Sequence, residues 1–107
     1  MSEFITIVTT TNSKENAQLI GNDAINLKLA ACVQLISSVN SIYRWKNEIC
    51  NEEEIILMIK TTMKSKDELV RIIHKNHVYE IPEIICYNMD ILNDDYRRWF
   101  KEEITEK

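Results

Sequence analysis

The stretch that decides the fold runs from residue 31 to residue 59 and reads ACVQLISSVNSIYRWKNEICNEEEIILMI. Apolar residues recur along Ala31 to Tyr43, which predicts a long strand. The polar break Lys46-Asn47-Glu48 separates that strand from a second apolar run, Ile55 to Ile59, so the two predict a β-hairpin. Asn47 is expected to adopt the left-handed backbone conformation of the turn, because its short side chain tolerates positive φ.

The second strand of this hairpin is apolar on both faces. Ile55, Leu57 and Ile59 point to one side, and Ile56 and Met58 point to the other. Two helices can cover only one side of a sheet, so the other side needs a further layer. We expect that layer to be the last helix or another copy of the chain, and we predict a homo-oligomer held together through its sheets.

The segments around the hairpin complete the order βαββαβ followed by a helix. They are a strand from Phe4 to Thr11, a helix capped by Ser13, a helix opened by the capping box Ser65-Lys66-Asp67-Glu68, a strand from Ile84 to Met89, and a helix capped by Asn93. With right-handed crossovers, this order predicts an α+β fold, the ferredoxin-like sandwich with an antiparallel sheet and an extra C-terminal helix. At 107 residues, the chain 1–107 is expected to form a single domain.

Composition excludes several classes of function. The chain has one glycine, Gly21, and one proline, Pro82, so it lacks phosphate-cradling loops, dinucleotide-binding turns and nucleophile elbows. Gly21 falls on the inner face of the first helix, where it either allows close approach to the sheet or is simply tolerated. A net charge of -4 and no basic run longer than Arg97-Arg98 disfavour nucleic-acid binding.

The chain carries no apolar stretch long enough to cross a membrane and no basic leader, so we expect no membrane association. Its three cysteines are widely spaced and form no C-x-x-C pair, which favours a reducing compartment and a cytoplasmic location. Cys32 and Cys86 are expected in the core, and Cys50 in an exposed loop. No serine or cysteine lies near a histidine in sequence, so we predict no enzyme.

The densest chemical cluster is His77-Val78-Tyr79-Glu80-Ile81-Pro82-Glu83. In an extended segment His77 and Tyr79 share one side, and with Glu80 or Glu83 nearby they could bind a metal or a polar ligand. Alternatively, His77 interacts with the free carbonyls at the end of the preceding helix. His74 could share an ion with His77 if that helix continues far enough.

A second cluster joins Tyr43-Arg44-Trp45 at the end of one hairpin strand to Glu52-Glu53-Glu54 at the start of the next. Aromatic and carboxylate groups that face each other across a ladder could hold a cation, or they could form a solvated edge. Lys60 is either a pocket charge or a snorkelling surface lysine. Tyr96 and Trp99 recur at helical spacing, which is typical of core or interface residues.

Five short motifs occur together in one order along the chain. They are Leu29-Ala30-Ala31-Cys32-Val33, Tyr43-x-Trp45, Glu54 with Ile59-Lys60-Thr61, His77-x-Tyr79-Glu80-x-Pro82-Glu83, and Tyr96-x-x-Trp99. In this order they resemble the CutA family of divalent-cation tolerance proteins. The resemblance implies a homotrimer of ferredoxin-like subunits similar to the PII signalling proteins, with clefts between subunits. It also implies tolerance of copper and other divalent ions without catalytic activity.

The resemblance carries over to particular residues of this chain. His77 corresponds to a metal-ligand position, and copper or another divalent cation is predicted to bind it weakly without being needed for folding. The residues that correspond to cleft positions are Tyr43, Trp45, Glu54, Lys60, Tyr79, Glu80 and Tyr96. Copper-binding bacterial relatives have a cysteine and a second histidine where this chain has Thr9 and Asn76. The alternative function is a signalling or scaffold trimer that binds a metabolite or a partner protein in its clefts.

Overall fold

The computed structural model describes residues 3–104 of the chain. Its elements are β1 (Phe4–Thr11), α1 (Lys14–Asn26), β2 (Cys32–Trp45), β3 (Glu48–Thr62), the 3-10 turn η1 (Met63–Ser65), α2 (Lys66–Asn76), β4 (Ile84–Met89) and α3 (Asp94–Glu102). The four strands form one antiparallel sheet in the order β2-β3-β1-β4. The predicted α+β fold is therefore confirmed, and β1 and β4 begin and end at the predicted residues.

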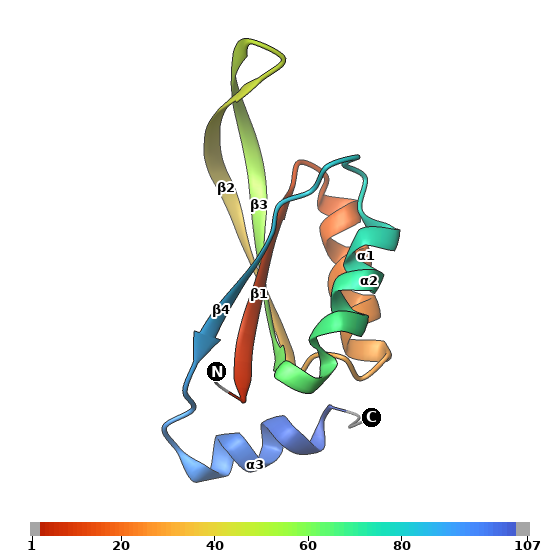
Figure 1. Cartoon of the computed structure of the whole chain (residues 1–107), viewed down its shortest axis with the longest axis vertical. Coiled ribbons are helices and arrows are strands. Elements are labelled where there is room, and N and C mark those ends of the chain that lie inside the picture. The colour runs from red at the N-terminus through yellow and green to blue at the C-terminus, as the bar shows by residue number, and fades with distance from the viewer. Residues whose placement is uncertain (1–2, 105–107) are drawn as a thin grey trace.

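Helices α1 and α2 lie side by side over one face of the sheet (Figure 1). In the ladder Ile7 pairs with Ile59 and Thr9 pairs with Leu57, and these four side chains are almost wholly buried. Alternate strand residues point to opposite faces, so this set faces the helices. The main core lies between the two layers and contains Ile5, Ile7, Ala17, Ile20, Ala24, Leu29, Ala30, Leu57, Ile59, Leu69, Ile72 and Ile73.

Helix α1 packs closely on the sheet because its inner face carries small side chains. The backbone N–H of Asn16 donates to the Ser13 hydroxyl at 3.1 Å, which confirms the predicted N-cap. A Cβ atom added to Gly21 would lie 3.3 Å from Val33 Cγ1, a tight contact. The glycine therefore allows close approach of the helix to β2, which was one of its two predicted roles.

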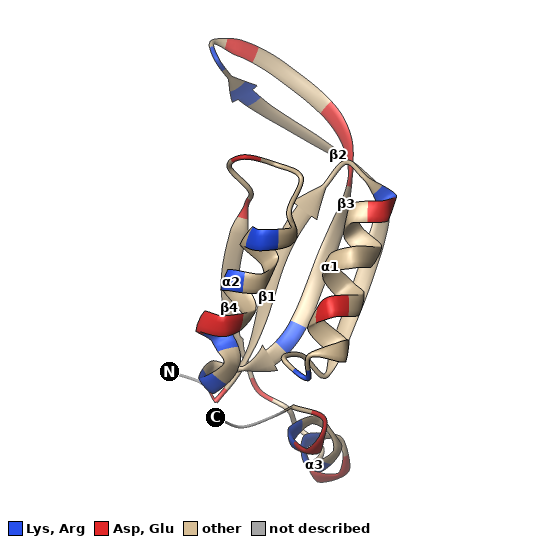
Figure 2. Cartoon of the chain, turned by 90° about the vertical axis from the view of Figure 1, so that its right-hand side faces the viewer, with Lys and Arg blue, Asp and Glu red and all other residues tan. Residues whose placement is uncertain are grey.

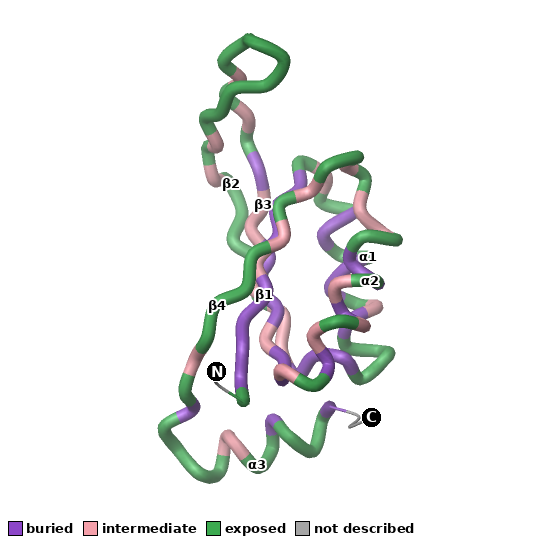
Figure 3. Tube along the Cα trace, in the orientation of Figure 1, coloured by how far each residue is buried: buried purple, intermediate pink, exposed green. Residues whose placement is uncertain are grey.

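The β2–β3 hairpin is longer than predicted and extends well beyond the other strands (Figure 1). Its turn residues Lys46 and Asn47 both have positive φ, at 50° and 67°, as a two-residue type I′ turn requires. The prediction for Asn47 is confirmed, whereas sequence reasoning did not foresee Lys46. A register shift between Ile36 and Val39 bends β2 near Ser38, and the far end of the hairpin is largely exposed (Figure 3).

The second face of the sheet is covered at one end only. There α3 packs Phe100 edge-on against Phe4 at 5.4 Å between ring centroids, in a small cluster with Ile91 and Ile104. Farther along this face the side chains of Ile36, Ile85 and Tyr87 are 42–57% exposed. The last helix therefore supplies only part of the second layer that the two-sided apolar pattern predicted.

Four local predictions are wrong. Asn93 precedes α3 as predicted, but its side chain makes no capping bond to the helix. Ser65 precedes α2 as predicted, but its side chain makes no capping bond to the helix, because the 3-10 turn η1 comes first and places Ser65 in the helical region. Cys50 lies within β3 rather than in a loop, and it is partly buried. Cys86, expected in the core, is exposed because β4 is an edge strand. No helix in residues 3–104 is long and apolar enough to span a membrane.

Candidate functional site

His77 is the first residue beyond α2, and its backbone is extended, with φ −72° and ψ 138°. This conformation turns the ring away from the helix and toward the end of β1. Nε2 lies 2.9 Å from the carbonyl oxygen of Thr10 and 3.1 Å from the hydroxyl of Thr9. The predicted alternative that His77 binds the free carbonyls of its own helix is therefore wrong, because the ring binds a strand carbonyl instead.

The partners of the His77 ring define its protonation. A carbonyl only accepts, so Nε2 carries the proton and donates to Thr10. Nδ1 accepts the backbone N–H of Tyr79 at 3.1 Å and therefore carries the lone pair. Burial, as the largest cause, lowers the pKa of His77 below its usual range. The ring is thus neutral at pH 7 in a single tautomer.

Tyr79 connects this loop to the hairpin. Its hydroxyl donates to Glu54 Oε2 at 2.6 Å, and Glu54 is only 5% exposed. Burial and this hydrogen bond raise the pKa of Tyr79 well above its usual range. The ring centroids of His77 and Tyr79 are 5.0 Å apart, so the predicted shared side is confirmed. Glu54 is therefore inside the structure, whereas a solvated edge was one of its two predicted roles.

A second tyrosine–carboxylate pair lies farther along the hairpin. The Tyr43 hydroxyl donates to Glu52 Oε1, and Asn12 Nδ2 donates to Glu52 Oε2 at 3.0 Å. The hydrogen bond to Glu52 is the largest cause that raises the pKa of Tyr43 to about 12. The same bond, followed by that from Asn12, lowers the pKa of Glu52. These shifts favour a neutral phenol and an ionised carboxylate.

The structure brings together four of the predicted site residues and separates the others. His77, Tyr79, Glu54 and Tyr43 line one side of the hairpin where it passes the end of β1. Trp45 lies at the exposed hairpin tip with Lys46 Nζ 6.0 Å from its ring centroid, where basic and acidic residues are interspersed (Figure 2).

The remaining predicted cleft residues lie elsewhere in the chain. Glu80 is exposed in the loop before β4. Lys60 is partly buried opposite Cys32, in the half of the sheet near α3. Burial and Cys32 raise the pKa of Tyr96 in α3, which places Tyr96 in that same region. Lys60 and Tyr96 could share a cleft with the His77 side only if a second subunit supplied them.

Sequence reasoning missed the polar residues that hold the His77 loop. Asn16 is 4% exposed and binds Thr11, Asn76 and Val78. The available indication was its position next to Ala17 on the inner face of a helix whose other inward residues are small or apolar. A buried carboxamide at such a position needs partners from elsewhere in the fold.

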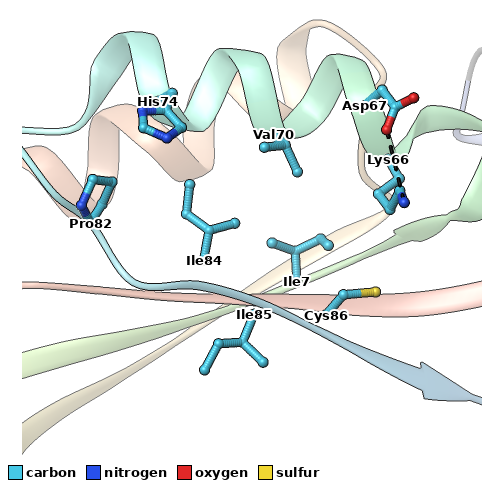
Figure 4. Close-up of a pocket in the computed structure, with 9 residues that line it drawn as sticks. All are labelled: Ile7, Lys66, Asp67, Val70, His74, Pro82, Ile84, Ile85 and Cys86. Atoms are coloured by element: carbon cyan, nitrogen blue, oxygen red, sulfur yellow. Dashed lines mark ion pairs between the residues drawn. The ribbon is translucent and has the colours of Figure 1, made fainter.

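The described residues do not assemble a complete metal centre within one chain. Within residues 3–104, no three His, Cys, Asp or Glu side chains are grouped so that they could hold an ion. His74 lines a groove of about 470 Å³ between α2 and β4, and His77 is not among the residues that line it (Figure 4). The other residues that line this groove are Ile7, Lys66, Asp67, Val70, Pro82, Ile84, Ile85 and Cys86.

Comparisons with known proteins match this chain over nearly its whole length. A family model described as CutA1 divalent ion tolerance protein matches residues 5–103. The divalent-cation tolerance protein CutA of Thermus thermophilus is 33% identical over 95% of this chain and 97% of its own length. Protein CutA of Arabidopsis thaliana, described as chloroplastic, is 30% identical, and the chain spans 53% of its length.

Solved structures agree with this match. The CutA1 structure from Oryza sativa has a TM-score of 0.94 at 30% identity and covers 99% of this chain, with 97% of its own chain covered. The structure from Thermus thermophilus has a TM-score of 0.90 at 30% identity and covers 95% of this chain, with 99% of its own covered. With sequence, fold and motif order in agreement, this chain belongs to the CutA1 divalent ion tolerance protein family.

Proposed function

We propose that this chain serves divalent-cation tolerance as a non-enzymatic, cytoplasmic homotrimer that binds divalent cations weakly, copper included, with His77 as a ligand. The observation that supports this proposal best is the hydrogen bond from His77 Nε2–H to the Thr10 carbonyl. Histidines that ligate metals usually donate their other ring N–H to a carbonyl or carboxylate, which fixes the tautomer and orients the lone pair. His77 has this arrangement, and its ligand atom would be Nδ1.

Weak metal binding is expected from the contacts of His77 Nδ1. Nδ1 accepts the Tyr79 N–H, so a metal ion must displace that hydrogen bond before it can bind. Thr9 and Asn76 supply neither the thiolate nor the second imidazole of the copper-binding relatives, so the site offers fewer soft donors. The remaining ligands would come from water or from another subunit. Imidazole suits copper, zinc and nickel, so the proposal does not require a single metal.

Copper titration tests His77 directly. We expect Cu²⁺ to bind the wild-type chain, and His77→Ala and His77→Gln to bind at least about tenfold more weakly, which is about 1.4 kcal/mol. The matched control is His74→Ala, which removes the other imidazole of the chain and should leave the affinity unchanged. Isothermal titration calorimetry measures all four proteins after circular dichroism has verified their folding. Equal affinities in all four would contradict the role of His77.

The trimer is supported by the open parts of the sheet. The outer strands of the sheet are β2 and β4, and neither has a neighbour on its outer side within residues 3–104. Ile36, Ile85 and Tyr87 are exposed on the face that α3 leaves open. Two different free edges on one chain can pair head to tail, and such pairing closes into a ring when the rotation per subunit permits.

A mass measurement tests this assembly. We expect light scattering coupled to size exclusion to give three times the 12.6 kDa chain mass at micromolar concentration. Tyr87→Lys, on the exposed part of the sheet, should shift the mass toward that of the monomer. The proposed interface would bury the new charge without a partner, which is costly. Leu19→Lys, at an exposed position on the outer side of α1, is the matched control and should keep the trimer mass. A monomeric wild-type mass would refute the assembly.

A further inference from the structure

Asn16 is a buried polar residue that the proposed function does not use. It is the third residue of α1, and its backbone N–H is bound to the Ser13 hydroxyl. Its side chain is only 4% exposed and lies on the helix face that packs toward the sheet. A carboxamide buried there costs free energy unless each polar atom finds a partner. The partners of Asn16 therefore indicate what the residue does.

Those partners lie on both sides of His77. Asn16 Nδ2 donates to the carbonyl oxygen of Asn76 at 2.8 Å. Its Oδ1 accepts the backbone N–H of Val78 at 3.2 Å and the hydroxyl of Thr11 at 3.1 Å. One side chain thus joins α1 to the residue before His77, to the residue after it, and to the end of the strand that carries the Thr10 carbonyl.

A further bond holds the same loop from the preceding side. The Asn76 side chain donates to Asp23 Oδ2 at 2.8 Å, so Asn76 is attached to α1 through both its backbone and its side chain. With the backbone fixed before and after it, His77 is held in its extended conformation. Its ring then meets the Thr10 carbonyl with Nε2 and the Tyr79 N–H with Nδ1.

We propose that Asn16 is a positioning residue for His77. By holding the loop, Asn16 keeps the imidazole in one tautomer, in which Nε2–H donates to the Thr10 carbonyl. The inference rests on the proposed function only in treating His77 as a metal ligand. The positioning itself belongs to the metal-free protein and is tested there. A merely structural role for Asn16 would lower the stability of the fold and leave the tautomer of the folded molecules unchanged.

The test reads the tautomer of each histidine in ¹⁵N-labelled, metal-free protein from long-range ¹H–¹⁵N spectra. The chain has two histidines, so His74 serves as an internal reference in the same spectrum. We expect His77 of the wild type to be in the Nε2–H form and to become a mixture of tautomers in Asn16→Ala. Asn22→Ala, at an exposed position of the same helix, is the matched control and should give the wild-type pattern.

A second variant separates the contacts and guards against unfolding. Asn16→Asp keeps both acceptor contacts but places an oxygen against the Asn76 carbonyl in place of the donor, so we expect it also to give a mixture of tautomers. An acidic residue in the first turn of a helix is favourable, which offsets part of the cost of the buried carboxylate, and circular dichroism verifies that the variant is folded. A pure Nε2–H tautomer in folded Asn16→Ala or Asn16→Asp would overturn the inference.

Copper binding forms a separate arm of the experiment. Residues that orient a metal-ligating histidine typically change metal affinity roughly 10- to 100-fold when mutated, so Asn16→Ala should weaken Cu²⁺ binding by about tenfold or more. If the wild type binds no copper, the proposed function fails, while the tautomer result still decides whether Asn16 positions His77. If copper binds through His77 but the tautomer does not change in the Asn16 variants, only the positioning inference fails.

Discussion

Replacing Phe100 with alanine is expected to lower the free energy of unfolding by about 3–5 kcal/mol, the usual loss for a large aromatic side chain removed from a core. Phe100 is fully buried and packs edge-on against Phe4, in the cluster that fastens α3 to the sheet. The other residues of this cluster, such as Phe4 and Ile91, would then face a cavity. Urea unfolding at a fixed protein concentration measures the loss, because the stability of an oligomer depends on its concentration.

The neighbouring aromatic residue provides the control for this experiment. Trp99 lies on the same helix but is 43% exposed, so Trp99→Ala should cost roughly half as much or less. Both variants replace a large ring with alanine, which favours helix, so the difference between them reports burial rather than helix propensity. Equal losses for the two variants would show that α3 is not anchored by Phe100.

Tyr79→Phe is expected to lower the free energy of unfolding by about 1–3 kcal/mol, because it removes a donor from a buried acceptor. Glu54 is 5% exposed and receives the Tyr79 hydroxyl at 2.6 Å. Phenylalanine fills the same space, so the loss reports the hydrogen bond and not a cavity. We expect the variant also to loosen the loop from His77 to Pro82, which hydrogen exchange at the Tyr79 amide would detect as faster exchange.

Tyr43→Phe is the matched control for this change. It removes the same hydroxyl from the same kind of tyrosine–glutamate pair, but Tyr43 and Glu52 lie on the solvent-exposed part of the hairpin. Water can replace the lost donor there, so the loss should be clearly smaller than for Tyr79→Phe. If Tyr43→Phe costs as much as Tyr79→Phe, the burial of Glu54 does not set the strength of the Tyr79 bond.

Much of the fold could be predicted from local sequence patterns. The limits of β1 and β4, the Ser13 cap and the left-handed Asn47 follow from runs of strand-forming residues and from residues with strong local preferences. The prediction failed where an adjoining turn changed the local geometry. Ser65 has the capping-box pattern, but the chain leaves β3 through a 3-10 turn, which takes the serine out of capping geometry.

The candidate site was only partly predictable for the same reason. His77 and Tyr79 are two residues apart, so their shared side could be read from the sequence. The contact between Tyr79 and Glu54 joins residues 25 positions apart, and that between His77 and Thr10 joins residues 67 positions apart. Such pairs form only when the loop after α2 crosses the end of β1 beside the hairpin.

The sequence by itself determined the order of strands and helices, the two-sided apolar sheet and the motifs of the family. Those features depend on the residues of each segment and on how often they recur. Only the tertiary structure decided that α3 covers just one end of the second face, that Glu54 is buried, and that Asn16 fixes the loop around His77. Burial and hydrogen-bond partners depend on which distant segments pack together, and a local sequence pattern does not specify those segments.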